Sequence, residues 1–158
     1  MTEVERKFLV TSEDFKLEAT NQFQIVQGFL NTHPERTVRI RVNGDIGYIT
    51  VKGLSSDSGA SRYEWEQEIP IQEAQDLLRL CETPLLEKTR HEIPFGTVIF
   101  EVDEFKGDND GLIVAEVELT KESDHFEKPD WLGDEVTGQI KYYNSQLVKN
   151  PYKSWWFN

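Results

Sequence analysis

Apolar and polar side chains alternate along most of the chain, which is the pattern of β-strands with one buried face. The alternation is clear in residues 3–10, 37–42, 47–52, 62–69, 98–105 and 113–119. Two further strands are expected at residues 23–30 and 86–93, and Asn43, Gly44 and Asp45 predict a tight hairpin turn between two of the runs. The pattern therefore predicts a mainly β (α+β) fold of antiparallel strands, about eight in number, which is enough to close a small barrel.

Helical spacing of apolar residues is confined to three segments, which predicts a few covering helices rather than a helical layer. The first is a short stretch at residues 13–17, and the last lies at residues 136–148. Between them, residues 71–81 carry an amphipathic stripe that ends before Pro84. Cys81 lies on this stripe, so we expect it to be a core residue rather than a nucleophile.

The composition indicates an acidic protein and excludes several classes. The chain has 158 residues, which predicts one domain over residues 1–158. Acidic residues outnumber basic ones by 29 to 17, and the net charge of -12 opposes nucleic-acid binding over the whole surface. There is no apolar run long enough for a membrane helix, no visible signal peptide, and one cysteine, which excludes an internal disulfide. We therefore expect a cytoplasmic protein with no nucleic-acid or membrane partner and no obligatory protein partner.

Charged side chains of one sign occur in close pairs on the same strand faces. Residues i and i+2 of a strand point to the same side, so Glu3 shares a face with Glu5. The same spacing pairs Arg39 with Arg41, Glu64 with Glu66, Lys88 with Arg90, Glu101 with Asp103, and Glu116 with Glu118. A solvent-exposed strand face without a binding role more often mixes acidic and basic side chains, because adjacent like charges repel each other. We expect Arg6, Glu68 and Lys106 to be ordinary solvent-exposed surface residues.

These pairs have a chemical interpretation. Paired carboxylates suit a divalent metal ion, which prefers oxygen ligands. Paired arginine and lysine side chains suit phosphate, which accepts charge-assisted hydrogen bonds from them. The presence of both on the strands of one barrel predicts a site for a metal-bound polyphosphate.

Short motifs follow the predicted strands in a fixed order. The chain starts with E-V-E-R-K at residues 3–7, and it continues with Q-G-F-L at 27–30, R-I-R at 39–41, T-V-K at 50–52, R-Y-E-W-E at 62–66, E-K-T-R at 87–90, E-V-D at 101–103 and E-V-E at 116–118. Residues 136–144 resemble a closing helix. Together, and over essentially the whole chain, the motifs resemble those of the CYTH superfamily, also called triphosphate tunnel metalloenzymes, in its short single-domain bacterial type.

This resemblance implies a closed, eight-stranded antiparallel tunnel with charged side chains inside. The basic residues expected to bind the triphosphate are Lys7, Arg39, Arg41, Lys52, Arg62, Lys88, Arg90 and Lys141. The acidic residues expected to hold Mg²⁺ or Mn²⁺ are Glu3, Glu5, Glu64, Glu66, Glu101, Asp103, Glu116 and Glu118. Catalytic roles are expected for Glu5, Lys7 and Glu118.

Three positions depart from the family pattern. Phe29 stands where relatives often have tyrosine, Lys141 where they commonly have arginine, and Gln139 where an acid is common. These departures concern the substrate preference more than the class of reaction.

The resemblance favours metal-dependent hydrolysis of inorganic triphosphate, with weaker activity on nucleoside triphosphates as an extension. The alternatives are an adenylate cyclase of the class that shares this fold, a thiamine triphosphatase, and a non-catalytic polyphosphate or nucleotide-binding module. A base or thiamine ring would need aromatic residues at the tunnel mouth, and the candidates, each equally explained by packing, are Tyr48, Tyr63, Trp65, Trp155, Trp156 and Phe157. The histidines follow no metal-binding spacing and are expected on the surface or in loops: His33, His91 and His125.

Overall fold

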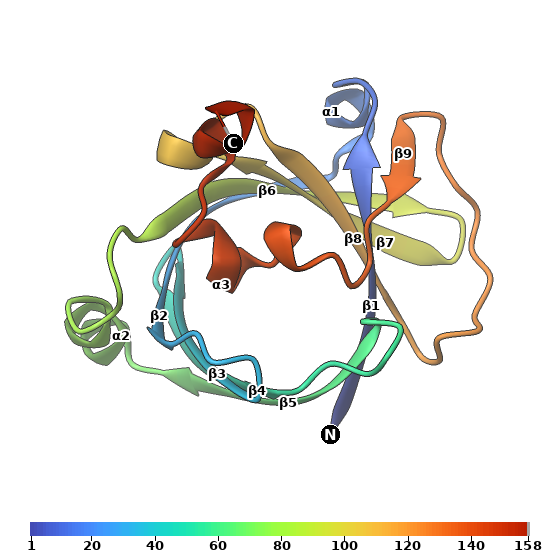
Figure 1. The fold of residues 1–158 in the computed structure, drawn as a ribbon. Coiled ribbons are helices and arrows are strands. Elements are labelled where there is room, and N and C mark those ends of the chain that lie inside the picture. Colours follow the sequence, from blue (N-terminus) through green and yellow to red (C-terminus); the bar gives the residue numbers. More distant parts are fainter. Residues whose placement is uncertain (158) are drawn as a thin grey trace.

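The computed structural model describes residues 1–157, and its main feature is a closed antiparallel barrel (Figure 1). The strands run in the order β5-β4-β3-β2-β6-β7-β8-β1, and β1 also pairs with β5, which closes the ring. The prediction of a closed eight-stranded barrel with a few short helices is confirmed. The strand bounds are Thr2–Val10 (β1), Asn21–Asn31 (β2), Arg36–Asn43 (β3), Ile46–Gly53 (β4), Ser61–Ile69 (β5), Leu86–Phe95 (β6), Val98–Phe105 (β7) and Ile113–Leu119 (β8).

One additional strand was not predicted. The four residues of β9, Leu132–Glu135, pair with the end of β1 outside the ring. The predicted hairpin is confirmed, because β3 ends at Asn43 and β4 begins at Ile46, and Gly44 adopts a φ of 62° in the turn. In the described part of the chain, no helix is both long enough and apolar enough to cross a membrane.

The apolar core of this barrel lies mainly outside its wall. Alternating residues of β7 and β8 point outward and are fully buried against the aromatic rings of Phe15 and Trp131. On the other side of the barrel, Ile40 of β3 packs under helix α2, Ile71–Leu78, beside Ala74 and Cys81. The prediction that Cys81 is a core residue is therefore confirmed. The inward faces of the same strands carry the charged residues.

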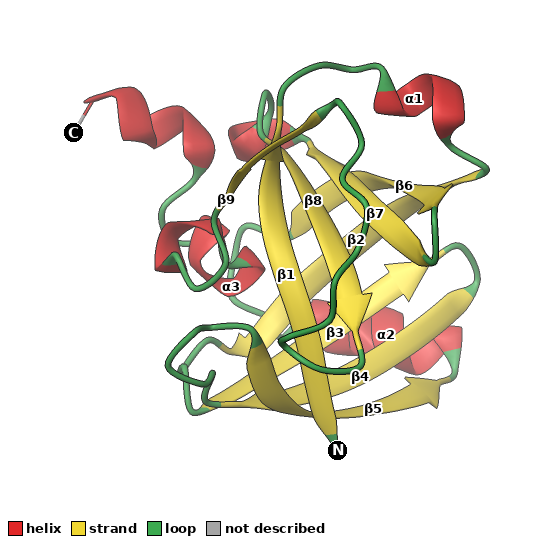
Figure 2. Ribbon diagram, turned by 90° about the vertical axis from the view of Figure 1, so that its right-hand side faces the viewer, coloured by secondary structure: helices red, strands yellow, loops and turns green. Residues whose placement is uncertain are grey.

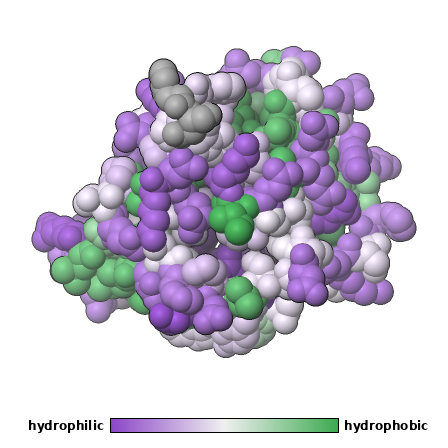
Figure 3. Space-filling model, viewed as in Figure 1, coloured by the Kyte–Doolittle hydropathy of each residue, from purple (hydrophilic) through white to green (hydrophobic). Residues whose placement is uncertain are grey.

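At one end of the barrel the inward positions become apolar. The inward rows that carry Lys88, Asp103 and Glu116 continue to Leu86, Phe105 and Val114, and these three residues pack against the C-terminal segment. That segment contributes Val136, Tyr142 and Leu147 to the cluster. The C-terminal segment therefore crosses this mouth of the barrel (Figure 1), and side chains fill most of that face in the space-filling view (Figure 3).

The helices are short and cover the outside or the ends of the barrel (Figure 2). Helix α1, Phe15–Glu18, and helix α2 fall where helices were predicted. The predicted helix at residues 136–148 is wrong: the segment forms a 3₁₀ turn, Ile140–Tyr142 (η2), and a single helical turn, Asn144–Leu147 (α3). It cannot be continuous, because Gly138 has a φ of 79° and Tyr143 has an extended ψ of 133°. Two further 3₁₀ turns are Gly107–Asn109 (η1) and Tyr152–Phe157 (η3).

Candidate active site

The inside of the barrel is a cavity lined mainly by charged side chains. Its acidic and basic residues come from every strand of the ring except β2, because each strand turns alternate side chains inward. The predicted residues that line it are Glu3, Glu5, Lys7, Arg39, Arg41, Lys52, Arg62, Glu64, Glu66, Lys88, Arg90, Glu101, Glu116 and Glu118. Two predicted site residues, Asp103 and Lys141, are outside this lining.

Three carboxylates gather at one place on the wall. Glu3 of β1, Glu64 of β5 and Glu118 of β8 each place an oxygen within 4.8 Å of the others. Burial raises the pKa of the Glu3 carboxyl, and the neighbouring Glu64 adds to the effect even though Lys52 opposes it. Burial and the charge on Glu3 also raise the pKa of Glu118. A bound divalent cation would relieve this crowding, so the donor set fits a hard metal ion.

Lys52 partly neutralises this cluster of carboxylates. Its Nζ donates to Oε1 of Glu3 at 2.9 Å and lies 3.4 Å from Oε2 of Glu64. The Lys52 side chain is on β4, and Lys52 and Glu64 are directly opposite each other in the β4–β5 pair. Lys52 is therefore an ammonium group paired with two of the three clustered carboxylates.

Glu5 and Glu116 form a second acidic pair deeper in the cavity. Burial raises the pKa of Glu5 well above its usual range, and the adjacent Glu116 raises it further. Burial would raise the pKa of Glu116 as well, but Lys7 and a hydrogen bond with Glu5 outweigh that effect and hold it well below its usual range. The two pKa values are therefore pushed apart, and Glu5 is the member of the pair that keeps a proton to higher pH.

Arg39 and Arg41 form a pair of guanidinium groups on the wall that share one carboxylate, Glu66. Arg39 donates from Nη2 to Oγ1 of Thr50 at 3.2 Å and to Oε2 of Glu66 at 3.3 Å. Nη2 of Arg41 lies 3.6 Å from the same Glu66 oxygen. Burial, together with the positive charges of Arg39 and Arg90, lowers the pKa of Arg41 to about 10. Among the described residues, the buried Nε of Arg39 also has no hydrogen-bond partner, so the two guanidinium groups are short of negative partners.

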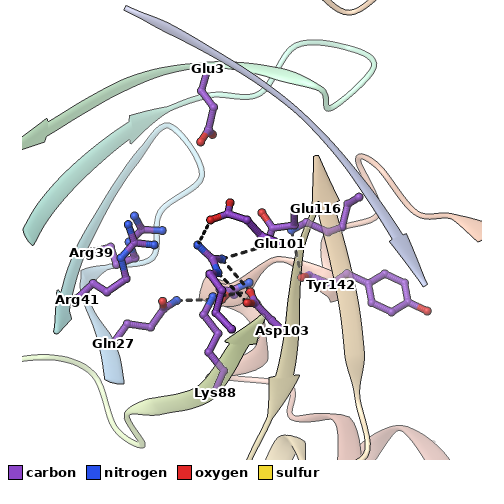
Figure 4. A network of polar contacts seen from close by, with 12 residues as sticks. Glu3, Gln27, Arg39, Arg41, Lys88, Glu101, Asp103, Glu116 and Tyr142 are labelled. Carbon is purple, nitrogen blue, oxygen red and sulfur yellow. Dashed lines mark hydrogen bonds and ion pairs between the residues drawn. The ribbon is translucent and has the colours of Figure 1, made fainter. Parts of the chain in front are cut away.

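Arg90 and Lys88 share one buried carboxylate, Asp103. Arg90 donates from Nε to Oδ1 of Asp103 at 2.8 Å and from Nη2 to Oδ2 at 2.9 Å. Nζ of Lys88 also lies 2.9 Å from Oδ2 of Asp103. Burial lowers the pKa of Lys88 to about 8 in spite of the Asp103 charge. Figure 4 shows Lys88 and Asp103 converging on one side of the cavity and Arg39 and Arg41 on the other.

The structure also places the remaining predicted residues. Lys141 is exposed on the C-terminal segment, with Nζ 4.7 Å from the ring centre of Trp155, and Gln139 is exposed nearby. Phe29 is buried and lines the cavity. Glu68 and Lys106 are exposed, as predicted, whereas Arg6 binds Glu135 of β9 through hydrogen bonds of 2.8 and 2.6 Å.

The aromatic candidates are mostly outside the cavity. Tyr63 and Trp65 point away from it on β5 and are 54% and 45% exposed. Tyr48 lies beside Arg41, whose guanidinium carbon is 5.7 Å from the ring centre. Trp155 packs against Tyr142, Trp156 is exposed, and the Phe157 side chain lies outside the described part of the structure.

The prediction for the histidines is wrong for His91. His33 and His125 are exposed in loops, as expected. His91 is buried on β6, where its Nε2 lies 2.6 Å from Oε1 of Glu104 and its ring packs edge-on against Phe15. Helix α1 supplies that ring from a distant part of the chain, so the strand alternation alone could not indicate the burial.

Several residues that line the cavity were not predicted individually. They belong to the β4–β5 loop and to the C-terminal segment, and they are Ser55, Gly59, Ala60, Thr137, Gly138, Tyr143, Asn144 and Ser145. Tyr143 stacks under Lys7, whose Nζ is 5.2 Å from the ring centre. The loop and the segment touch so closely that a Cβ on Gly59 would lie 2.2 Å from Cα of Gly138. The available sequence signal was the resemblance of residues 136–144 to a closing segment.

Comparisons with known proteins agree with this geometry. The CYTH domain model matches residues 1–152. An inorganic triphosphatase of Acetivibrio thermocellus is 48% identical over 153 residues, which cover 96% of each chain. An inorganic triphosphatase of Nitrosomonas europaea is 37% identical over 154 residues, covering 94% of this chain and 97% of the relative.

A solved structure extends the likeness to three dimensions. The crystal structure of the inorganic triphosphatase NE1496 superimposes with a TM-score of 0.64 at 30% sequence identity, and it covers 94% of this chain and 95% of that one. The charged barrel, the order of its motifs and these relatives lead to one conclusion: the chain belongs to the CYTH domain family.

Proposed function

We propose that this protein is a divalent-metal-dependent phosphohydrolase that cleaves inorganic triphosphate. The observation that carries the proposal is the cavity wall, where arginine and lysine side chains lie beside a cluster of three carboxylates. The fully aligned relatives named inorganic triphosphatase support the same activity.

Mg²⁺ or Mn²⁺ fits the carboxylates of Glu3, Glu64 and Glu118, whose oxygens are already within reach of one ion. When bound, such an ion supplies Lewis acidity at a phosphate oxygen and lowers the pKa of a coordinated water. Lys52 neutralises part of the charge on Glu3 and Glu64, and it lines the same cavity as the arginines that would bind the phosphates.

The basic residues bind and orient the substrate. Arg39 and Arg41 are short of negative partners, so triphosphate oxygens satisfy their free N–H groups through charge-assisted hydrogen bonds. Lys7 and Arg90 line the same cavity and are placed to contact further oxygens of the phosphate chain. Phosphoryl transfer needs mainly this positioning and charge neutralisation, because the protein has little covalent chemistry to perform.

Two glutamate side chains are placed to transfer protons during the reaction. Glu118 is the more accessible of them, so it can accept the proton of the attacking water. Glu5 has the higher pKa of the Glu5–Glu116 pair, so it is the member that can hold a proton and donate it to a phosphate oxygen as the P–O bond breaks. Glu5 and Glu118 are two of the three residues for which the sequence predicts catalytic roles, and Lys7 is the third.

The geometry favours bare triphosphate over substrates with a ring. A nucleotide base or a thiamine ring needs an aromatic wall near the phosphates. Tyr63 and Trp65 are on the outer surface of β5, so they cannot provide it. Phe29 and Tyr143 do line the cavity, but Phe29 is buried and Tyr143 packs against Lys7. Tyr48 lies beside Arg41 and is outside that lining.

Phosphate release from a substrate panel tests the proposal. Purified protein would be assayed with tripolyphosphate, ATP and thiamine triphosphate, each with Mg²⁺ and with Mn²⁺, and the products would be separated. Tripolyphosphate should be the preferred substrate and should yield phosphate and pyrophosphate. Formation of cyclic AMP, or preferred cleavage of thiamine triphosphate, would replace the proposed activity by one of the alternatives. Glu3→Gln should be inactive, and the exposed Glu68→Gln should remain active.

A further inference from the structure

A buried network connects the C-terminal segment to the phosphate-binding wall. We infer that Asp103 is a positioning residue rather than a metal ligand, and that it works together with Asn144 of α3. Asp103 holds the Arg90 guanidinium and the Lys88 ammonium in place, while Asn144 ties the segment across the barrel mouth to Lys88. The inference deepens the proposed function and rests on it.

Both oxygens of Asp103 are already used by cations. Oδ1 accepts from Nε of Arg90, and Oδ2 accepts from Nη2 of Arg90 and Nζ of Lys88, all within 2.9 Å. The Asp103 side chain is fully buried and does not line the cavity. A metal ion at this carboxylate would have to lie next to two positive charges, so the predicted metal role does not fit the observed contacts.

Asn144 joins three separate elements at one atom. Its Oδ1 accepts from Nζ of Lys88 on β6 and from Nε2 of Gln27 on β2, both at 2.9 Å. Gln27 is fully buried, and its side chain is directed at the same group of residues in Figure 4. The C-terminal segment is therefore held by the wall as well as by its apolar packing.

Asp103 determines the direction in which Arg90 points. With Nε and Nη2 bound to Asp103, the guanidinium extends Nη1 to 3.2 Å from Oε2 of Glu101, and Nη2 lies 3.8 Å from Oε1 of Glu116. The planar fork cannot rotate without breaking two hydrogen bonds. Loss of Asp103 should therefore weaken triphosphate binding through Arg90 and leave metal binding intact.

Metal affinity and substrate affinity distinguish the two roles. Calorimetric titration with Mn²⁺ alone should give the same dissociation constant for Asp103→Asn and the wild type, whereas Glu3→Gln should bind Mn²⁺ much more weakly. The KM for tripolyphosphate should rise about tenfold or more in Asp103→Asn. The reason is that Arg90, no longer held by Asp103, loses its charge-assisted hydrogen bonds to the phosphate oxygens. The exposed Asp108→Asn is the matched control and should change neither quantity. A parallel loss of Mn²⁺ affinity in Asp103→Asn and Glu3→Gln would make Asp103 a metal ligand and overturn the inference.

Asn144→Ala provides a second test if Asp103→Asn folds poorly. It removes one acceptor from Lys88, so KM for tripolyphosphate should rise about threefold to tenfold with kcat nearly unchanged. Gln146→Ala in the same helical turn is the control, and equal kinetics for the two variants would refute the role of Asn144.

A binding measurement keeps the inference independent of catalysis. Tripolyphosphate in EDTA should raise the melting temperature of the wild type more than that of Asn144→Ala, and this comparison needs no turnover. A wild type that binds tripolyphosphate but does not cleave it would contradict the proposed function and leave the network testable. Equal shifts for the wild type and Asn144→Ala would contradict the network alone.

Discussion

Replacing Arg41 by methionine should make the ligand-free protein more stable while weakening its binding of tripolyphosphate. Arg41 remains charged at neutral pH, although burial and the charges of Arg39 and Arg90 lower its pKa to about 10. The difference from the usual value corresponds to about 3 kcal/mol of unfavourable free energy in the folded state, at about 1.4 kcal/mol per pKa unit. Methionine removes that charge and keeps part of the aliphatic stem. We therefore expect a gain of about 1–3 kcal/mol in the free energy of unfolding, or about 2–4 °C in melting temperature per kcal/mol.

Thermal melts and kinetics check both parts of this prediction. Melting temperatures would be measured in EDTA, with and without tripolyphosphate, and KM would be measured with metal present. Loss of charge-assisted hydrogen bonds should raise KM about ten- to a hundredfold and reduce the melting shift caused by tripolyphosphate. Arg36→Met is the matched control, because Arg36 begins the same strand and is exposed, so its effect should stay within about 0.5 kcal/mol. If the two variants behave alike in melts and in KM, the charged wall does not act as described. A marked loss of stability in Arg41→Met would show that packing outweighs the repulsion.

Removal of divalent ions with excess EDTA should abolish phosphate release, and added Mg²⁺ or Mn²⁺ should restore it; undiminished turnover would exclude a metal mechanism. Glu5→Gln should lower kcat about a hundredfold with the fold preserved in circular dichroism, because glutamine cannot release the proton that Glu5 supplies, while Glu68→Gln keeps wild-type kcat. Cys81 should resist iodoacetamide at pH 8 in the native protein, because burial raises its pKa to about 11, and it should react quickly in urea; rapid native labelling would contradict its burial. Gly59→Ala should lower the melting temperature, because the new Cβ would lie 2.2 Å from Cα of Gly138 and the residue has a φ of 80°; an unchanged melt would show that the loop can separate from the segment.

The barrel could be predicted from the sequence because strand alternation has a strict period of two. That period also groups the charges by face, and it explains why most predicted site residues line one cavity. β9 was missed because its four residues, Leu-Gly-Asp-Glu, are too short to show any alternation. The prediction of a continuous closing helix was wrong because the apolar residues at 136–148 are spaced for packing into the barrel mouth. The positive φ of Gly138 prevents a continuous helix there.

The remaining differences come from contacts between distant segments. Asp103 has the same face as Glu101, yet its carboxylate is captured by neighbouring strand residues before it reaches the cavity. Alternation gives the side of the sheet to which a residue points, but it cannot tell a cavity ligand from a partner within the wall. No periodic pattern in the sequence indicates the role of Asn144, because that role depends on the path of the C-terminal segment across the barrel mouth.

The placement of the apolar core outside the barrel wall separates folding from recognition. Phe100, Val117 and Ile40 are fully buried against the covering elements, so they carry much of the folding free energy without touching the cavity. Side chains such as Arg39 and Glu66 can therefore change without opening a hole in the core. A scaffold of this kind tolerates mutational drift in its lumen, and a new pattern of charges can evolve there to select a different anion while the same outer layers keep the protein folded.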